Sequence, residues 1–202
     1  MNQADTPAAI AIRQVVENWV MWRDYGDWER FRTCWHDDGY MVAIWFQGPV
    51  EDFIRASKIA WERGPATSLH FLGGCSIDVA GNRAIAQTKT TISRRGLVEG
   101  ILCDSVCTGR FYDFFECRQG RWAIVLRQPI YEKDRIDPVD PSATLSLDPA
   151  ILEQFPPGYR YLAYGRAKAG EQIPRSLPGL KGPEVEALYA RGRRWLAGGA
   201  LD

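Results

Sequence analysis

The 202-residue sequence has no excess of either charge, no long apolar run and no recognisable export signal. Its 25 Lys and Arg balance 25 Asp and Glu, which argues against a nucleic-acid-coating protein, because such proteins need a basic surface to displace phosphate counterions. No stretch approaches the roughly 18 uninterrupted apolar residues of a membrane helix. No basic segment leads into an apolar run near the start, so we expect a cytoplasmic location, with no membrane or nucleic-acid partner.

The sequence also has little metal-binding chemistry. Its five cysteines are scattered without CxxC spacing, so we expect them to be reduced thiols. The histidines are His36 and His70 alone, and Cys103 and Cys107 share one face of a predicted strand without further ligands. We therefore expect no metal site.

Aromatic residues, in contrast, are abundant, with 8 Trp, 8 Tyr and 8 Phe. So many rings can fill a large core or line an apolar cavity, and composition alone does not distinguish these uses. The length predicts one domain with an appendage.

The N-terminal part of the chain has the spacing of helices. Apolar residues recur at helical intervals over 6–24, which predicts a first helix. A second helix is predicted over 28–36, followed by a short strand over 40–46. A third helix is expected to begin at Gly48-Pro49 and to end at Gly64-Pro65.

From residue 68 the pattern is typical of strands joined by turns. Strands are predicted over 68–79, 83–95, 97–117 and 122–130. Three helices followed by a curled antiparallel sheet make an α+β fold.

Beyond residue 131 the composition changes, and a segment rich in Pro, Asp and Ser precedes short helical pieces. The helical pieces are expected near 149–155, 158–169 and 183–196. We therefore divide the chain into a domain over 1–131 and a linker with a helical extension over 132–202. This extension packs on the core, caps a cavity or contacts another subunit.

Three polar residues, Asp24, His70 and Arg127, fall where the pattern predicts apolar surroundings. A buried imidazole beside a carboxylate makes a good general base, because its tautomer is fixed and its cation is stabilised. A nearby guanidinium can hold a developing anion. Structural roles remain open for each: Asp24 as a helix cap, His70 as a core residue, and Arg127 as a partner of Asp113.

Four segments of the sequence resemble a known family. They are RDYGDWE at 23–29, Gly48-Pro49, Leu69-His70-Phe71, and the hairpin over 109–122 with its GRFYDFFE run. On these segments, residues 7–131 resemble the SnoaL-like branch of the nuclear transport factor 2-like (cystatin-like) superfamily. The resemblance implies a cone-shaped α+β fold with a deep apolar pocket.

The resemblance is greatest to the branch whose enzymes use an Asp–His dyad, the scytalone dehydratases, bile-acid dehydratases and hexachlorocyclohexane dehydrochlorinases. Asp24 and His70 match the two dyad positions, and Arg127 falls where the dehydrochlorinases carry an arginine. Trp19 occupies the place of a substrate-contacting Lys or Tyr. The second histidine of scytalone dehydratases has no counterpart, and the two-carboxylate pattern of steroid isomerases is not recognisable.

These residues predict a cofactor-independent lyase of the dehydratase type, or an isomerase, acting on a small apolar cyclic substrate. His70 is expected to remove a proton from carbon, Asp24 to orient His70, and Arg127 to stabilise the anion. The expected pocket walls are Trp19, Trp45, Phe53 and Tyr112. The alternative is a non-catalytic ligand-binding or oligomer-forming subunit, like the small subunit of ring-hydroxylating dioxygenases. The resemblance also implies a homo-oligomer, a dimer or trimer.

Overall fold

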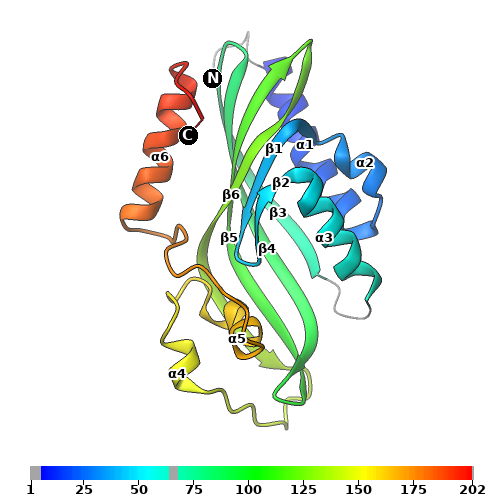
Figure 1. Ribbon diagram of the computed structural model, residues 1–202, viewed down its shortest axis with the longest axis vertical. Helices are drawn as coiled ribbons and strands as arrows, with labels where there is room; N and C mark the ends of the chain where they lie inside the picture. The colour runs from blue at the N-terminus through cyan, green and yellow to red at the C-terminus, as the bar shows by residue number, and fades with distance from the viewer. Residues whose placement is uncertain (1–5, 64–67, 202) are drawn as a thin grey trace.

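The computed structural model describes residues 6–63 and 68–201 and has an α+β architecture, as the sequence predicted (Figure 1). Helix α1 covers Thr6–Tyr25, because apolar side chains at helical spacing bury one face against the sheet. Helix α2 covers only Trp28–Arg32, and the Asp27 carboxylate caps it by accepting a hydrogen bond from the backbone N–H of Arg30 at 3.2 Å.

The prediction that the second helix extends to residue 36 is wrong. Thr33 ends the helix, and its hydroxyl donates to the carbonyl of Arg30 at 2.7 Å. Strand β1 then runs over Trp35–Ala43, where Trp35 pairs with Ile124 of the last strand. Trp35 is fully buried, so the pattern identified a core residue but assigned it to the wrong element.

The single strand predicted over 40–46 is a hairpin. Strand β1 turns back at Ile44-Trp45 into β2, Phe46–Pro49, and helix α3 follows directly over Val50–Glu62. The prediction that Gly48-Pro49 precedes the third helix is therefore confirmed. The expected stop at Gly64-Pro65 lies outside the described residues.

The sheet has six strands in the order β2-β1-β6-β5-β4-β3. The remaining strands are β3 Ser68–Ala80, β4 Arg83–Val98, β5 Ile101–Arg118 and β6 Arg121–Pro138. The sheet is mixed, because β1 pairs with β6 in parallel while the other neighbours are antiparallel.

Two strand predictions need correction. The run predicted over 97–117 is divided at Glu99-Gly100, where both residues have positive φ and form the turn between β4 and β5. The last strand does not end at Ile130 but continues to Pro138, paired with β5 throughout. The expected domain boundary at residue 131 falls inside this strand, and the division of the chain stays a prediction.

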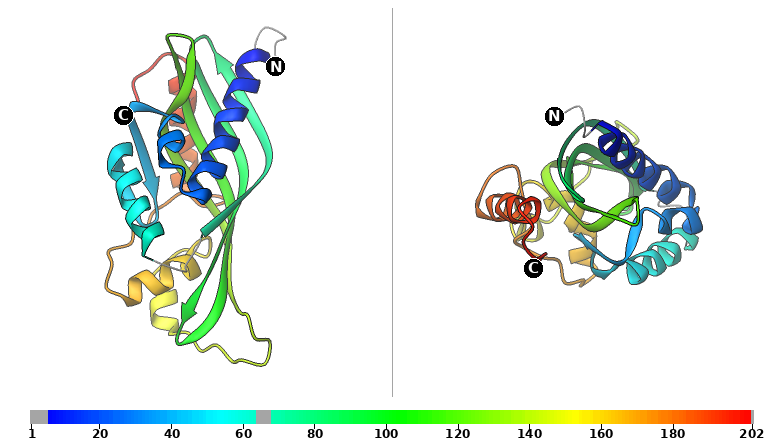
Figure 2. Two further views of the ribbon diagram at one scale, coloured as in Figure 1. Left: turned by 90° about the vertical axis from the view of Figure 1, so that its right-hand side faces the viewer. Right: turned by 90° about the horizontal axis from the view of Figure 1, so that it is seen from above.

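The curved sheet lies between two layers of helices (Figures 1 and 2). Helices α1, α2 and α3 lie on one side, and α6, Pro183–Leu196, lies on the other. Helices α4, Pro149–Leu152, and α5, Arg160–Lys168, lie at the end of the molecule where β4 turns into β5 (Figure 1). There Glu99 accepts hydrogen bonds from the Tyr164 hydroxyl and the Lys168 ammonium, both at 2.6 Å.

Helix α6 covers the outer face of the sheet through an apolar stripe. Its Leu188 and Trp195 pack against Tyr112 and Phe114 of β5. The indole N–H of Trp195 donates to the Phe115 carbonyl at 3.2 Å. No helix among residues 6–63 and 68–201 is long and apolar enough to cross a membrane.

Candidate active site

The predicted dyad is formed. Asp24 lies in the last turn of α1, and its Oδ1 is 2.7 Å from Nδ1 of His70 on β3. The other oxygen, Oδ2, accepts a hydrogen bond from the backbone N–H of His70, also at 2.7 Å. The side chains are 8% exposed for His70 and 12% for Asp24. Two hydrogen bonds to one carboxylate thus fix both the strand and the ring.

The surroundings of His70 favour the neutral imidazole. Burial lowers the pKa of His70, the charges of Arg23 and Arg127 lower it further, and Asp24 opposes them. Because the ionised Asp24 carboxylate only accepts hydrogen bonds, the neutral ring carries its proton on Nδ1. Its Nε2 then presents a lone pair, and no group in the described part of the chain hydrogen-bonds to that nitrogen.

The His70 ring lines a cavity of about 480 Å³, a size typical of small-molecule sites. Trp19, Trp45 and Phe53, three of the four expected walls, line it as well. They come from α1, the β1–β2 turn and α3, which pack together as one aromatic cluster. The Trp19 ring meets the His70 ring edge to face, with centroids 5.4 Å apart. The dyad therefore faces an apolar chamber.

Tyr112, the fourth expected wall, does not line this cavity. It lies on the outer face of the sheet, where its ring contacts Tyr189 of α6 with centroids 5.6 Å apart. Its neighbour Phe111 lines the cavity in its place. Successive residues of a strand point to opposite faces, so the prediction was displaced by a single residue.

Arg127 lies behind the cavity wall and is not part of the lining. Its guanidinium donates to both oxygens of Asp113, at 2.6 and 2.7 Å, and both side chains are 0% exposed. Its Cζ lies 4.2 Å from the Trp19 ring centroid and 4.0 Å from that of Phe111. Nη1 of Arg127 is buried without a partner among the described residues. The pairing with Asp113 that the sequence left open is thus present.

Several lining residues were not foreseen, among them Arg23 of α1, Arg94 of β4 and Arg166 of α5. The hairpin formed by β3 and β4 was predicted, but its turn alone does not place Arg94. A regular hairpin from the Ala80↔Arg83 pair would place His70 opposite Ser93, whereas a bulge at Gly73-Gly74 moves the register by one and pairs it with Ile92. Arg94, two residues further, therefore shares the cavity face.

Arg166 and its neighbour Leu162 had no such signal. They reach the cavity from the C-terminal extension, and α5 is held there by Asp134, which accepts the backbone N–H of Leu162 at 2.8 Å. Burial raises the pKa of Asp134 to about 6. Of the arrangements considered for the extension, α5 therefore forms part of the cavity wall and α6 packs on the core.

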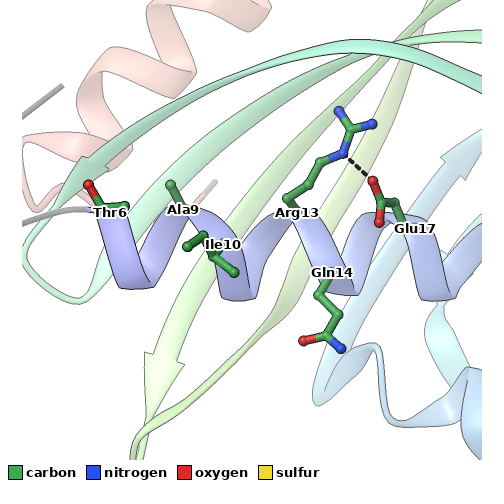
Figure 3. A pocket seen from close by; sticks show the side chains of 6 residues that line it. All are labelled: Thr6, Ala9, Ile10, Arg13, Gln14 and Glu17. Carbon is green, nitrogen blue, oxygen red and sulfur yellow. Dashed lines mark hydrogen bonds and ion pairs between the residues drawn. The ribbon is translucent and has the colours of Figure 1, made fainter.

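A second hollow lies along the outside of α1 (Figure 3). All six residues that line it belong to this one helix, and its charged members pair with each other, Arg13 Nε lying 2.6 Å from Glu17 Oε1. The hollow contains neither dyad residue. Elsewhere in residues 6–63 and 68–201, no three His, Cys, Asp or Glu side chains are grouped as metal ligands.

Comparison with known proteins extends over the whole chain. A pea pathogenicity protein 2 of Fusarium vanettenii is 34% identical over 205 residues, which cover 96% of this chain and 87% of that protein. An uncharacterised protein of Emericella nidulans is 31% identical over 208 residues, covering 95% and 87%. These matches include most of the C-terminal extension.

Solved structures share the fold at low identity. A putative scytalone dehydratase from Novosphingobium aromaticivorans superposes with a TM-score of 0.57 and 14% identity, over 72% of this chain and 100% of that one. The hexachlorocyclohexane dehydrochlorinase LinA-type3 of Novosphingobium barchaimii gives 0.56 and 16%, over 72% and 99%. The sequence model of the SnoaL-like domain matches residues 6–128. The chain therefore belongs to the SnoaL-like domain family, with the nuclear transport factor 2-like, cystatin-like fold.

Proposed function

We propose that the protein is a cofactor-independent lyase of the dehydratase type, or an isomerase, that acts on a small, largely apolar cyclic substrate. The observation that carries this proposal is the geometry of His70. Its Nδ1 is held by Asp24 at 2.7 Å, while the ring lines the apolar cavity with Nε2 unpartnered in the described structure.

The chemistry begins with proton transfer. Nε2 of His70 takes a proton from a carbon next to a carbonyl, and the released electron pair forms the enolate. In an elimination the neighbouring C–O bond then breaks as the C=C bond forms, and the imidazolium returns its proton to the departing hydroxide, giving water. In an isomerisation the same proton returns to a different carbon. Asp24 stabilises the imidazolium in both cases.

Arg23, which lines the cavity next to the dyad, provides positive charge for the developing anion, and burial lowers its pKa while leaving it a cation at neutral pH. Arg127, expected in this role from the sequence, lies behind Trp19 and Phe111 with its charge balanced by Asp113, so it does not contact a ligand in the cavity. The aromatic walls exclude water and so strengthen these interactions.

The test is turnover of a panel of cyclic β-hydroxy ketones, including a β-hydroxytetralone whose loss of water gives a fluorescent naphthol. His70→Gln is expected to lower kcat by about 10²–10⁴-fold, because it removes the general base. Asp24→Asn should lower kcat by about 10- to 100-fold, which corresponds to the free energy of one hydrogen bond to a charged group. Incubation in D2O followed by NMR detects proton abstraction even where no leaving group departs.

The matched control is His36→Gln, which changes the other buried histidine. The His36 ring contacts the Glu116 carbonyl and Arg121 and lies outside the cavity, so turnover should stay at the wild-type value. Equal turnover by wild type and a folded His70→Gln variant would contradict the proposal. Absence of turnover and of exchange across the panel would favour the non-catalytic ligand-binding alternative. The homo-oligomeric state and the cytoplasmic location stay predictions.

A further inference from the structure

The cavity combines apolar walls with positive charge, both beside the dyad and further along the β3–β4 hairpin. Its lining includes Arg23, Arg94 and Arg166, and among the residues that the structure describes no Asp or Glu side chain is part of it. The carboxylates that act on these arginines are Asp24, which holds His70 and opposes the lowering of the Arg23 pKa by burial, and Glu171, which does the same for Arg94 and lies 2.6 Å from Arg166. The charge of this lining therefore exceeds that of the acidic groups around it.

Arg94 is directly bound by no carboxylate among the described residues. No ion pair or hydrogen bond joins its side chain to another described residue, as is also true of Arg23, whereas the adjacent Arg95 binds both oxygens of Asp104, at 2.8 and 2.7 Å. Alternation along β4 explains the difference, since Arg94 faces the cavity and Arg95 the other side. Partial burial and the nearby Arg166 both lower the pKa of Arg94, and Glu171 opposes them.

The positions of Arg94 and His70 on the β3–β4 hairpin set the spacing between the positive charge and the base along the cavity. Across the β3–β4 hairpin, His70 pairs with Ile92 and Ser68 pairs with Arg94, and all four residues line the cavity. Two residues of strand span about 6.6 Å, so the backbone positions from which Arg94 and His70 enter the cavity are offset along it by roughly the width of one substituted ring. Arg166 reaches the cavity from α5, with its Cζ 5.5 Å from the Trp45 ring centroid, and lies close enough to Arg94 for its charge to lower the pKa of Arg94.

We propose that the Arg94–Arg166 end of the cavity is a carboxylate-binding subsite, and that the cyclic substrate carries a carboxylate about one ring away from the carbon that His70 deprotonates. This inference rests on the proposed function for the role of His70, but the subsite itself stands on the arginines alone. A planar guanidinium binds a carboxylate through two parallel hydrogen bonds, which would also fix the substrate ring against the walls. The resulting substrate class is that of aromatic or alicyclic ring acids.

The experiment compares naphthoate with naphthamide, a neutral ligand of the same shape, by isothermal titration calorimetry on the full chain. Wild type is expected to bind naphthoate at least about tenfold more tightly than naphthamide, because a hydrogen bond to a charged group is worth about one to two factors of ten. Arg94→Gln should weaken the binding of naphthoate about tenfold and leave the affinity for naphthamide unchanged. Arg166→Gln should act in the same direction.

Arg95→Gln is the matched control, since it removes a positive charge one residue away on the other face of β4. It is expected to leave both affinities unchanged. The subsite would be overturned if wild type bound the two ligands equally or did not bind naphthoate. It would also be overturned if Arg94→Gln lost binding of both ligands, or if Arg95→Gln weakened naphthoate binding as much as Arg94→Gln.

Binding also separates this proposal from the catalytic one, because naphthoate has no leaving group and no acidic C–H bond. His70→Gln should retain the preference for naphthoate over naphthamide. If the protein prefers naphthoate to naphthamide but turns over the hydroxy-ketone panel equally well with and without His70, the catalytic proposal alone is overturned. Turnover that depends on His70 without any preference for naphthoate would overturn the subsite alone.

Discussion

Replacement of Asp113 by Asn is expected to destabilise the protein strongly, because it leaves the Arg127 guanidinium buried without a counter-charge. Both side chains are 0% exposed, and the Arg127 guanidinium packs against both the Trp19 and the Phe111 ring. Removing one member of a buried ion pair typically costs about 3–5 kcal/mol of unfolding free energy. In a chain of this size that corresponds to a fall in Tm of about 6–20 °C.

The assay is urea unfolding followed by tryptophan fluorescence, with Asp104→Asn as the matched control. Asp104 also binds an arginine through both oxygens, but that pair is solvent-exposed, so its loss should change the unfolding free energy little. Asp113→Leu combined with Arg127→Met should recover most of the lost stability, because burial raises the pKa of Asp113 even beside Arg127. A loss below about 1 kcal/mol for Asp113→Asn would refute the reasoning that this pair is dry.

Two further predictions concern acid sensitivity and the packing of α6. Because burial lowers the pKa of His70, the folded chain binds fewer protons than the unfolded chain below about pH 6.5, and the unfolding free energy should fall on acidification. Urea unfolding at several pH values should show a weaker dependence of the unfolding free energy on pH for His70→Gln than for wild type. An unchanged pH dependence would contradict this. Gly192→Ala places a Cβ against the Tyr112 hydroxyl and should cost about 1–3 kcal/mol, measured by urea unfolding. In Gly165→Ala on α5 the added Cβ meets open space, and the unfolding free energy should instead rise by about 0.5–1 kcal/mol. Equal effects of the two substitutions would contradict the packing of α6 on Tyr112.

The parts of the fold that depend on local pattern were predictable. The first helix was placed to within about a residue, because its buried stripe repeats at the helical period. The same pattern placed Asp24 at the helix end, the strand pattern placed His70 on the strand after the third helix, and the family resemblance paired the two residues. The two residues that the sequence proposed as a dyad do meet, at 2.7 Å.

The wrong secondary-structure predictions fall where strand pairing between segments far apart in the sequence determines the structure. Trp35 fits a helical stripe, yet pairing with Ile124 of β6, far away in the sequence, draws it into a strand. Residues 132–138 look like a linker because of their Pro and Asp content, but β5 provides a partner strand along their whole length. Neither partner can be read from a short window of sequence.

The site shows the same limit at the level of single residues. Tyr112 and Phe111 are adjacent, and only the register of β5 in the sheet decides which ring faces the cavity. Arg94 depends on the Gly73-Gly74 bulge in the same way. Arg166 depends on the docking of a distant helix, for which hydrophobic periodicity carries no information.

The most direct test of the central claim, that His70 is a neutral base held by Asp24 with Nε2 open to the cavity, is its protonation state by NMR. A long-range ¹H–¹⁵N correlation spectrum is simple here, because the chain has two histidines and His36→Gln assigns them. We expect a proton on Nδ1 and an unprotonated Nε2 near neutral pH, with protonation of the ring below about pH 6.5, the ordinary value, because burial lowers the pKa of His70. A proton on Nε2 of the neutral ring, or an imidazolium at neutral pH, would contradict it.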